Sequence, residues 1–215
     1  MQLILYDLDG TLVDTREDIA RAANHMRAAM GLASLPREAI CAHVGWGLSQ
    51  LVQSCLGTGE PQAIEEGIRI YRAHYAEHLL DHTVLYPGAQ ELLEHFRNRR
   101  QAVVTNKPNP YSREILTALG VAGYFFEIVA GDSGFAKKPD PQAIQALMER
   151  AGVPAGETLL VGDSPIDVET GRRAGVKCAA VGHGFSPEEE LEKACPDWAV
   201  RDLRELLDLA RSEQW

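Results

Sequence analysis

The sequence lacks several features that would assign it to a broad class at once. Its 215 residues include only four cysteines, and none of them forms a C-x-x-C pair. We therefore expect free thiols rather than a disulfide framework or a cysteine-based zinc site. No apolar run approaches the length of a membrane span, and no basic region followed by a long apolar one opens the sequence. These absences predict a cytoplasmic protein that has no membrane partner.

Positive charge is also scarce. The chain has 21 Lys and Arg residues against 31 Asp and Glu residues, which gives a formal net charge of -10 at pH 7. A general nucleic-acid binder needs a basic surface, so we expect no nucleic-acid partner. A small phosphorylated substrate is not excluded, because one lysine and one divalent cation in a cleft can outweigh a distant negative surface.

The most informative stretch lies near the start of the chain, where the apolar run Leu3–Tyr6 ends at two aspartates. A short apolar run bounded by a glycine predicts a strand that is buried on both faces. Asp7 and Asp9 are two residues apart, so in an extended segment their side chains point the same way. They would lie just past the carboxyl end of the strand, where open α/β sheets bind ligands.

A hairpin is the alternative interpretation of this stretch. Asp9-Gly10 suits a type I′ turn between Leu3–Tyr6 and Thr11–Val13, with Asp7 as an incidental polar residue. The two interpretations are compatible at this point, because a hairpin could itself carry the carboxylates. The rest of the chain has to decide between them.

The pattern is helical from about residue 15 to residue 82. Thr15 followed by Asp18 gives a weak capping-box signal, and apolar residues then recur at helical spacing as far as Gly31. Three more helices are predicted, over residues 36–45, 48–56 and 64–79. Consecutive amphipathic helices with short joints predict a small bundle. This block could be a purely structural subdomain, but its place beside a strand end also suits a lid.

Strands alternate with helices after residue 86. Strands are predicted over residues 102–104, 126–130, 158–161 and 178–181. Helices are predicted over residues 89–96, 115–119, 144–151, 166–174 and 203–210, and another helix is predicted to start at Ser186. This alternation requires right-handed crossovers and predicts a doubly wound, mainly parallel α/β sheet. The expected domains are a Rossmann-like core of residues 1–14 and 83–215 and an inserted helical bundle of residues 15–82.

Polar residues follow the predicted strands of this core. Thr105, Asn106 and Lys107 come after the second strand, where a hydroxyl and amides before a helix can hold a phosphate. Taken alone, Thr105-Asn106 is more typical of a loop or a helix cap than of a phosphate site, and Lys138 after the third strand is typical of a surface charge.

Two further carboxylates follow the fourth strand. Asp163 comes directly after Gly162, and Asp167 lies on the first turn of the next predicted helix. An aspartate at such a position is as typical of a helix N-cap as of a metal site. The spacing alone leaves both interpretations open.

Taken together, these motifs occur in a specific order. Asp-x-Asp-Gly-Thr occupies residues 7–11, Thr105 ends the second strand, Lys138-Pro139 follows the third, and Gly-Asp-Ser-x-x-Asp occupies residues 162–167. In this order the chain resembles the haloacid-dehalogenase-like superfamily over essentially its whole length. Leu-Val-Asp-Thr, Thr-Asn-Lys-Pro and Lys-Lys-Pro-Asp-Pro are similar to the phosphoglycolate phosphatase branch. The resemblance implies that the first strand is central, flanked by the second and fourth, and that the helical bundle is a cap.

The resemblance also implies a reaction, the hydrolysis of small phosphomonoesters. Asp7 would attack phosphorus to form an aspartyl-phosphate, which water then hydrolyses. Asp9 would protonate the leaving alcohol and afterwards deprotonate that water. The implied cofactor is Mg²⁺, held by the Asp7 side chain, the Asp9 backbone carbonyl and Asp163.

The remaining site residues are expected to hold the substrate or to support these groups. Thr105, Asn106 and Lys138 would hold the phosphoryl oxygens, and Asp167 would orient Lys138 or support the metal. Further expected contacts to phosphate or substrate are Gly10, Thr11, Lys107 and Trp46, and Ser164 is an expected supporting residue.

Substrate choice is assigned to the cap, because a site that recognises only phosphoryl oxygens cannot distinguish one phosphomonoester from another. The Gly45-Trp46-Gly47 loop pairs flexible backbone with one bulky ring, which predicts closure over a short substrate. Packing of Trp46 between cap helices is the alternative. This loop has no Arg or Lys for a substrate carboxylate, and the other candidate cations are Arg16, Lys107, Arg113 and His183.

Other functions of the same fold are the alternatives. A sugar-phosphate mutase would share Asp7 and Asp9 but needs a cap that excludes water, and a pyrophosphatase would differ in its substrate. A catalytically silent binding or regulatory protein is disfavoured, because no expected catalytic position is missing. A dehalogenase is disfavoured, because that branch lacks the carboxylate that Asp9 supplies. We expect a small phosphorylated substrate and either a monomer or a homodimer.

Overall fold

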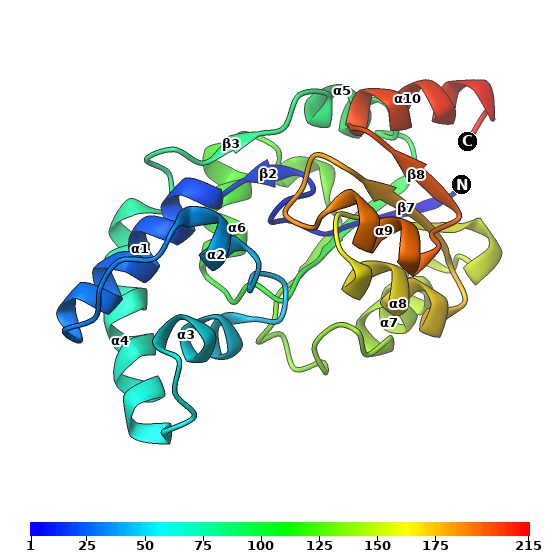
Figure 1. Cartoon of the computed structure of the whole chain (residues 1–215). Coiled ribbons are helices and arrows are strands. Elements are labelled where there is room, and N and C mark those ends of the chain that lie inside the picture. The colour runs from blue at the N-terminus through cyan, green and yellow to red at the C-terminus, as the bar shows by residue number, and fades with distance from the viewer.

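Six parallel strands form the central sheet, in the order β5-β4-β1-β6-β7-β8. In a computed structural model that describes residues 1–215, they are β1 (Leu3–Tyr6), β4 (Arg100–Val104), β5 (Glu127–Val129), β6 (Thr158–Gly162), β7 (Lys177–Val181) and β8 (Trp198–Val200) (Figure 1). β1 is flanked by β4 and β6, which confirms the expected central position of the first strand. The doubly wound parallel sheet is confirmed, and the hairpin interpretation is wrong, because Asp9 and Val13 form only an isolated parallel bridge.

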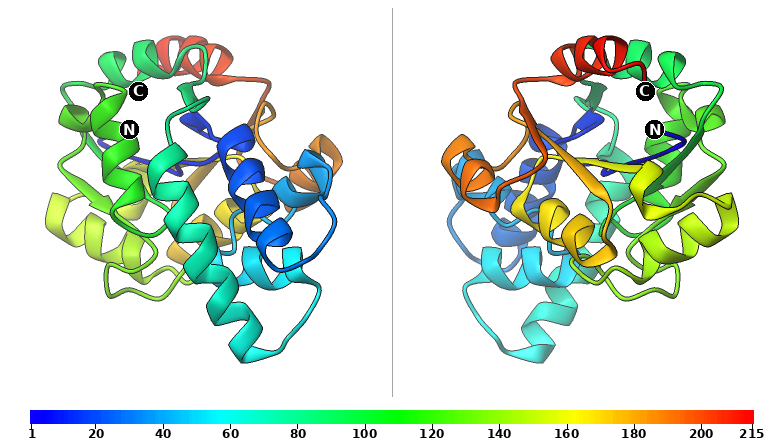
Figure 2. Two further views of the ribbon diagram at one scale, coloured as in Figure 1. Left: turned by 90° about the vertical axis from the view of Figure 1, so that its left-hand side faces the viewer. Right: turned by 90° about the vertical axis from the view of Figure 1, so that its right-hand side faces the viewer.

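Helices cover both faces of this sheet (Figure 2). The face that carries Ile4 and Tyr6 packs against α5 (Ala89–His95), α6 (Tyr111–Ala118) and α10 (Leu203–Ser212). The face that carries Leu3 and Leu5 packs against α7 (Gln142–Ala151), which lies beside α8 (Pro165–Ala174). Because successive side chains of a strand point to opposite faces, all four residues of β1 are buried, and this explains the uninterrupted apolar run. The remaining short elements are η1 (Ala122–Tyr124), η2 (Ala155–Glu157) and α9 (Glu188–Ala194).

Four consecutive helices lie to one side of the sheet (Figure 1). They are α1 (Arg16–Ala29), α2 (Arg37–Cys41), α3 (Leu48–Leu56) and α4 (Pro61–His78). The chain leaves for them through β2 (Val13–Asp14) and returns through β3 (Val84–Leu85), and these two strands pair antiparallel. We refer to residues 15–82 as the helical segment. All four predicted helices are present, although α2 ends at Cys41, before the predicted end near residue 45, and α4 begins at Pro61, three residues before the predicted start.

Gly67 explains how closely these helices pack. It lies in the middle of α4, where glycine costs about 1 kcal/mol relative to alanine. A Cβ at this position would lie 2.8 Å from the Val52 side chain, 3.0 Å from that of Leu56 and 3.2 Å from the Met26 sulfur. The missing side chain therefore allows α4 to approach both α3 and α1.

The expected capping box at Thr15 and Asp18 does not form, because both side chains make contacts outside the helix. The Thr15 hydroxyl donates to Asp9 Oδ1 at 2.7 Å, and α1 has no side-chain cap. Buried Asp18 Oδ2 accepts from the His82 N–H at 3.0 Å and from the Thr83 N–H and hydroxyl at 2.8 Å each. These polar residues join the start of α1 to the site and to the chain where it returns to the core.

The sequence does not predict β2, β3 or β8. The first two have only two residues each, and β8 is only partly buried, so none carries a clear periodic pattern. No helix in the structure combines the length and the apolar character needed to cross a membrane.

Candidate active site

Side chains from four neighbouring strand ends meet at the carboxyl edge of the sheet. Asp7 follows β1, Thr105 follows β4, Lys138 lies in the connection after β5, and Asp163 follows β6. All four are buried, although they are polar or charged. Charged groups are rarely buried without partners, so the contacts among them define what this edge can do.

Lys138 lies between two carboxylates. Its Nζ is 2.8 Å from Asp7 Oδ1 and 2.6 Å from Asp167 Oδ1. Burial alone would lower the pKa of Lys138, but the charges of Asp167 and Asp7 outweigh it and raise the pKa above its ordinary value. Lys138 is therefore a buried cation, and the interpretation of it as a surface charge is wrong.

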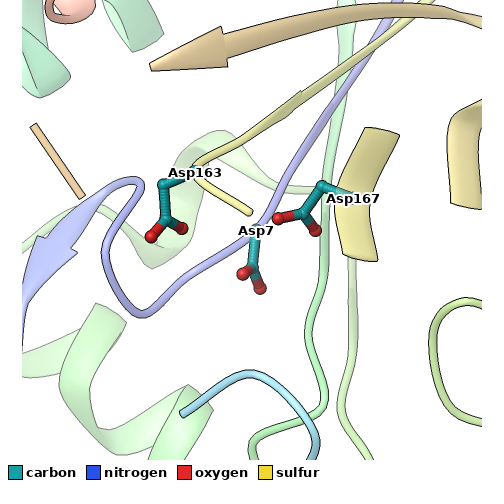
Figure 3. A group of neighbouring side chains, drawn as sticks. All are labelled: Asp7, Asp163 and Asp167. Atoms are coloured by element: carbon teal, nitrogen blue, oxygen red, sulfur yellow. The ribbon is translucent and has the colours of Figure 1, made fainter. Parts of the chain in front are cut away.

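Asp7, Asp163 and Asp167 form a cluster in which one oxygen of each lies within 4.8 Å of the others. Figure 3 shows Asp163 and Asp167 on either side of Asp7. Burial raises the pKa of Asp7 to about 6 against the opposing charge of Lys138, and the Asp167 charge adds to the rise. Burial, followed by the charges of Asp7 and Asp167, raises the pKa of Asp163 well above its ordinary value. The cluster is therefore short of positive charge.

A divalent cation fits this shortage. Asp7 Oδ1 is a buried carboxylate oxygen with no hydrogen-bond donor, since its contact with Lys138 is an ion pair without hydrogen-bond geometry. Carboxylate oxygens in such a cluster are the ligands that Mg²⁺ prefers. Asp163 is held in place, because Oδ1 accepts from the Thr11 hydroxyl and Oδ2 from the Phe185 N–H, both at 2.8 Å.

Asp167 has a different position from the other two carboxylates. Its Oδ1 accepts from Lys138 at 2.6 Å, and its Oδ2 accepts from the Ser164 hydroxyl at 2.5 Å and from the Ser164 N–H at 3.2 Å. Ser164 caps α8 in a reciprocal capping box with Asp167. Both oxygens of Asp167 are thus engaged, one by Lys138 and the other by Ser164, and its expected role, to orient Lys138 or to support the metal, stays a prediction.

Gly10 and Thr11 shape the pocket of Asp163. Gly10 has a φ of +86°, a conformation that L side chains rarely adopt, and a Cβ there would collide with the Asp163 carboxylate. In the structure their contacts are therefore with Asp163, and the expected contact with a phosphate stays a prediction.

Asn106 fastens three segments together. Its Nδ2 donates to the carbonyl of Gly45 at 2.7 Å and to that of Lys138 at 3.0 Å, while its Oδ1 accepts from the Lys138 N–H at 2.9 Å. The amide therefore positions Lys138 and the loop before α3, and both of its N–H donors are engaged. Thr105, whose hydroxyl accepts from the Lys107 N–H at 3.2 Å, faces the cavity described below.

A second buried lysine lies at the boundary with the helical segment. Lys107 Nζ donates to Asp9 Oδ1 at 2.9 Å, to Asp9 Oδ2 at 3.1 Å and to the Tyr75 hydroxyl at 2.8 Å. Thr15 completes this group through its hydrogen bond to Asp9 Oδ1. Asp9 and Lys107 come from the core, whereas Tyr75 comes from α4, so the hydrogen bond from Lys107 to Tyr75 joins the two parts of the molecule.

Comparison with known proteins agrees with this arrangement. The sequence profile described as haloacid dehalogenase-like hydrolase matches residues 4–181. The chain belongs to this family. It is 37% identical over 214 residues to a phosphoglycolate phosphatase of Pseudomonas syringae pv. tomato, covering 96% of this chain and 78% of the relative. A phosphoglycolate phosphatase of Chromobacterium violaceum is 36% identical over 220 residues, covering 99% and 97%.

A solved structure gives the same picture for the fold. The crystal structure of a predicted phosphoglycolate phosphatase from Haemophilus somnus 129PT superposes with a TM-score of 0.93 at 28% sequence identity. The superposition covers 98% of each chain, so the sheet and the helical segment of this hydrolase both have counterparts there.

The hydrolase has a cavity of about 50 Å³ between the sheet edge and the helical segment, which is enough for a few water molecules. The core contributes Asp7, Asp9, Thr105 and Lys107 to its walls. The helical segment contributes Ile19, Val44, Gly45, Gly47, Leu48, Leu51, Tyr71 and Tyr75. The polar and charged side chains of the core therefore face a wall of the cavity that is mainly apolar and aromatic.

Trp46 is not part of this wall. Its neighbours Gly45 and Gly47 line the cavity, but the Trp46 side chain does not, and the residue is 51% exposed. The packing alternative is therefore wrong, because a residue this exposed is not packed between helices. Closure of Trp46 over a substrate stays a prediction.

Lys107 is the one candidate cation that reaches the cavity. Arg16 is held by Asp14 at 3.0 Å and by the Tyr86 hydroxyl at 2.9 Å. His183 stacks on Tyr86 and lies 3.1 Å from the Thr11 carbonyl, and Arg113 is exposed on α6. The geometry thus ranks four residues that the sequence left unranked.

Sequence reasoning missed Tyr75 and Thr15. Tyr75 belongs to the apolar stripe of α4 and was assigned to the core of the bundle, and Thr15 was assigned to a cap. A buried tyrosine hydroxyl needs a hydrogen-bond partner, which is the signal that singles out Tyr75. Its partner, Lys107, is far away in the sequence, so only the fold identifies the pair.

Proposed function

We propose that this hydrolase is a Mg²⁺-dependent phosphatase that cleaves small phosphomonoesters, with phosphoglycolate or a similarly small phosphorylated acid as its substrate. The observation that carries the proposal is the buried Asp7 carboxylate, which lies 2.8 Å from Lys138 inside a cluster of three carboxylates. The names of the two curated relatives support the choice of substrate.

The first half of the reaction is assigned to Asp7 and Asp9. A carboxylate oxygen of Asp7 attacks phosphorus and forms an oxygen–phosphorus bond, while the bond from phosphorus to the ester oxygen breaks. The released electron pair stays on the alcohol oxygen, which takes a proton from the carboxyl group of Asp9. Lys138 holds positive charge beside the reacting groups, where it stabilises charge on the phosphoryl oxygens.

The second half returns the enzyme to its starting state. Water attacks phosphorus, the bond to Asp7 breaks, and the electron pair returns to the Asp7 carboxylate. Asp9, now ionised, takes the proton of that water and is ready for the next ester. The products are one alcohol and one phosphate, and no group of the enzyme is consumed.

Asp7, Asp163 and the backbone carbonyl of Asp9 would hold Mg²⁺. When bound, the ion supplies the positive charge that lets an anionic carboxylate approach a phosphate dianion. The residues of the chain prepare for it: Thr11 and Phe185 fix Asp163, and Asp167 keeps Lys138 beside Asp7.

The helical segment, residues 15–82, is proposed to be a cap that closes over the substrate and selects the leaving alcohol. Support comes from its wall of the cavity and from the Asn106 hydrogen bond to Gly45, which ties the loop before α3 to the site. Closure over the bound ester strengthens the charge interactions beneath the cap, and water must reach the aspartyl-phosphate once the alcohol has left.

The test is a phosphatase screen with Mg²⁺ over small phosphomonoesters, pyrophosphate, hexose 1-phosphates and nucleotides. We expect the highest kcat/KM for phosphoglycolate or another small phosphorylated acid, and no turnover by the Asp7→Asn variant measured in parallel. Absence of phosphate release from every substrate would contradict the proposal, and preference for a hexose 1-phosphate would contradict its choice of substrate.

A further inference from the structure

We infer that Lys107 selects the substrate, and that a carboxylate on the leaving group replaces Asp9 as its ionic partner. This inference rests on the proposed phosphatase function and adds the residue that reads the leaving group. It also narrows the substrate class to phosphate esters of 2-hydroxy acids.

The first step of the argument concerns position. Lys107 is the only Lys, Arg or His among the residues that line the cavity. It is 8% exposed, and its ammonium lies 4.8 Å from the centre of the Tyr75 ring. An anionic leaving group bound in this cavity therefore has one cation to pair with, beneath the apolar side chains of the helical segment.

The second step concerns hydrogen bonds. An ammonium group has three donors, and Lys107 directs them at the two oxygens of Asp9 and the hydroxyl of Tyr75. Asp9 Oδ1 keeps the Thr15 hydroxyl at 2.7 Å when Lys107 moves, whereas Asp9 Oδ2 has no other donor. Transfer of Lys107 to a substrate carboxylate thus frees Oδ2 of Asp9 to face the ester oxygen.

The third step concerns charge. When Asp9 carries the proton that the proposed reaction assigns to it and turns to the ester oxygen of a neutral leaving group, Lys107 has no ionic partner in a buried site, which is costly. A leaving group with its own carboxylate provides the replacement. Neutral alcohols of the same size do not, so the exchange discriminates by charge rather than by volume.

The fourth step concerns distance. Asp9 and Lys107 are in direct contact, so the two substrate groups that they bind must also be close neighbours. A carboxylate on the same carbon as the ester oxygen meets this condition. A longer spacer would separate the carboxylate from Lys107, and no other Lys, Arg or His lines the cavity to neutralise it.

The experiment compares phosphoglycolate with its neutral isostere phosphoglycolamide, on the wild type and on Lys107→Met. We expect the wild type to favour the acid in kcat/KM by on the order of 100-fold, the range of a hydrogen-bonded charge pair. Lys107→Met should reduce this ratio below about tenfold, chiefly by slowing the acid. Lys193→Met is the control, because this lysine is exposed on α9, pairs with Glu189 and does not line the cavity, and it should keep the wild-type ratio.

The ratio of kcat/KM for the acid to that for the amide distinguishes a lysine that binds the leaving group from a lysine that only holds Asp9 in place. If Lys107 only held Asp9 in place, Lys107→Met would slow both substrates alike and leave their ratio unchanged, which would overturn the inference. A wild type that turns over both esters equally would overturn it without any variant, so misfolding of Lys107→Met cannot hide a failure. If the wild type hydrolyses no phosphate ester at all, the proposed function fails instead.

Tyr75→Phe provides a second variant that keeps both charges. It removes the third hydrogen bond of Lys107 and retains the ring, so we expect KM for phosphoglycolate to rise by about tenfold, with a smaller rise for the amide. Equal changes in KM for the two substrates would contradict a role for this hydroxyl in holding Lys107 towards the leaving group.

Discussion

The two buried lysines of the site differ in what holds them. Lys138 pairs with Asp7, which follows β1, and with Asp167, which lies on α8. Both partners belong to the core. Lys107 pairs with Asp9 on the same sheet edge, but its third donor goes to Tyr75 of α4. One lysine is therefore fixed within the core, and the other spans the boundary between the core and the helical segment.

In the proposed reaction, this difference separates the lysine that acts on the phosphoryl group from the lysine that selects the leaving group. A phosphoryl group is the same in every phosphomonoester, so the lysine beside it can be fixed permanently. The leaving alcohol varies, so the lysine that meets it gains from partners that can be exchanged. We refer to Asp7, Lys138, Asp163 and Asp167 as the core group. Variants of the core group should affect all substrates alike, whereas variants at the boundary should affect substrates unequally.

The largest effect is expected from Asp7→Asn, which removes the proposed nucleophile. An amide cannot form the acyl-phosphate, so activity should fall by several orders of magnitude for every substrate while the protein remains folded. Steady-state kinetics and circular dichroism check this. Retention of more than about a tenth of the activity would show that Asp7 is not the nucleophile.

Removal of the metal should reduce the phosphatase activity almost as much as Asp7→Asn does. Activity is expected to require Mg²⁺, and Ca²⁺ should inhibit, because its larger and more variable coordination shell would misplace Asp7 for in-line attack. Phosphate release is measured after dialysis against chelator and after return of each ion. Full turnover in excess chelator would remove the metal role from Asp7 and Asp163.

Lys138→Met should lower kcat/KM by about 100-fold to 1,000-fold, the usual loss for one group that stabilises transition-state charge. The loss should be similar for phosphoglycolate, phosphoglycolamide and a small aryl phosphate, because Lys138 meets only the shared phosphoryl group. A loss of kcat/KM for phosphoglycolate alone would show that Lys138, like Lys107, acts on the leaving group.

The pH dependence of stability tests the charge shortage of the core group. In the metal-free protein the pKa of Asp7 is raised from 3.8 to about 6, so the folded state holds a proton that the unfolded state releases. Its contribution to stability is present below about pH 4 and is lost as the pH rises through about 6. Asp7→Asn avoids this loss and should exceed the wild type at pH 7 by up to about 3 kcal/mol.

Urea unfolding in the presence of chelator measures this difference. The two free energies of unfolding should converge towards pH 4, where Asp7 is neutral in the wild type as well. Addition of Mg²⁺ at pH 7 should stabilise the wild type more than the variant, because ligand bound only to the folded state adds stability. A wild type that is the more stable protein at pH 7 without metal would contradict the account.

The smallest effect is expected from Trp46→Ala. Trp46 is 51% exposed and its side chain does not line the cavity. The ratio of kcat/KM between small and large leaving groups should therefore change by no more than about threefold, which corresponds to a free energy of about RT. The melting temperature should stay close to that of the wild type. A larger shift in substrate preference would restore the role over the substrate that the sequence suggests for this ring.

The elements of the fold were largely predictable, because strong periodicity specifies them. The apolar run before Asp7, the alternation after residue 86 and the stripes of α1 and α4 all have their expected structures. The two-residue strands β2 and β3 could not be predicted, since pairing of the two connections to the helical segment is a property of the tertiary fold. The capping signal at Thr15 failed for the same reason, since tertiary contacts took its hydroxyl.

The clustering of the candidate site residues was predictable where motifs end strands, because parallel strands bring their carboxyl ends together. Asp7, Lys138, Asp163 and Asp167 lie in one cluster as that rule requires. The contact of Lys107 with Tyr75 could not be predicted, because it depends on where α4 lies against the sheet edge. The occupied amide of Asn106 likewise depends on the Gly45 loop meeting the core.

Trapping of the covalent intermediate tests the central claim most directly. The Mg²⁺-loaded enzyme is mixed with phosphoglycolate, quenched in acid within its first turnovers, digested and examined by mass spectrometry. The account predicts one added phosphoryl group on the peptide that carries Asp7, and none in Asp7→Asn treated in the same way. Release of phosphate at the full rate with no label on Asp7, or with the label on another residue, would contradict it.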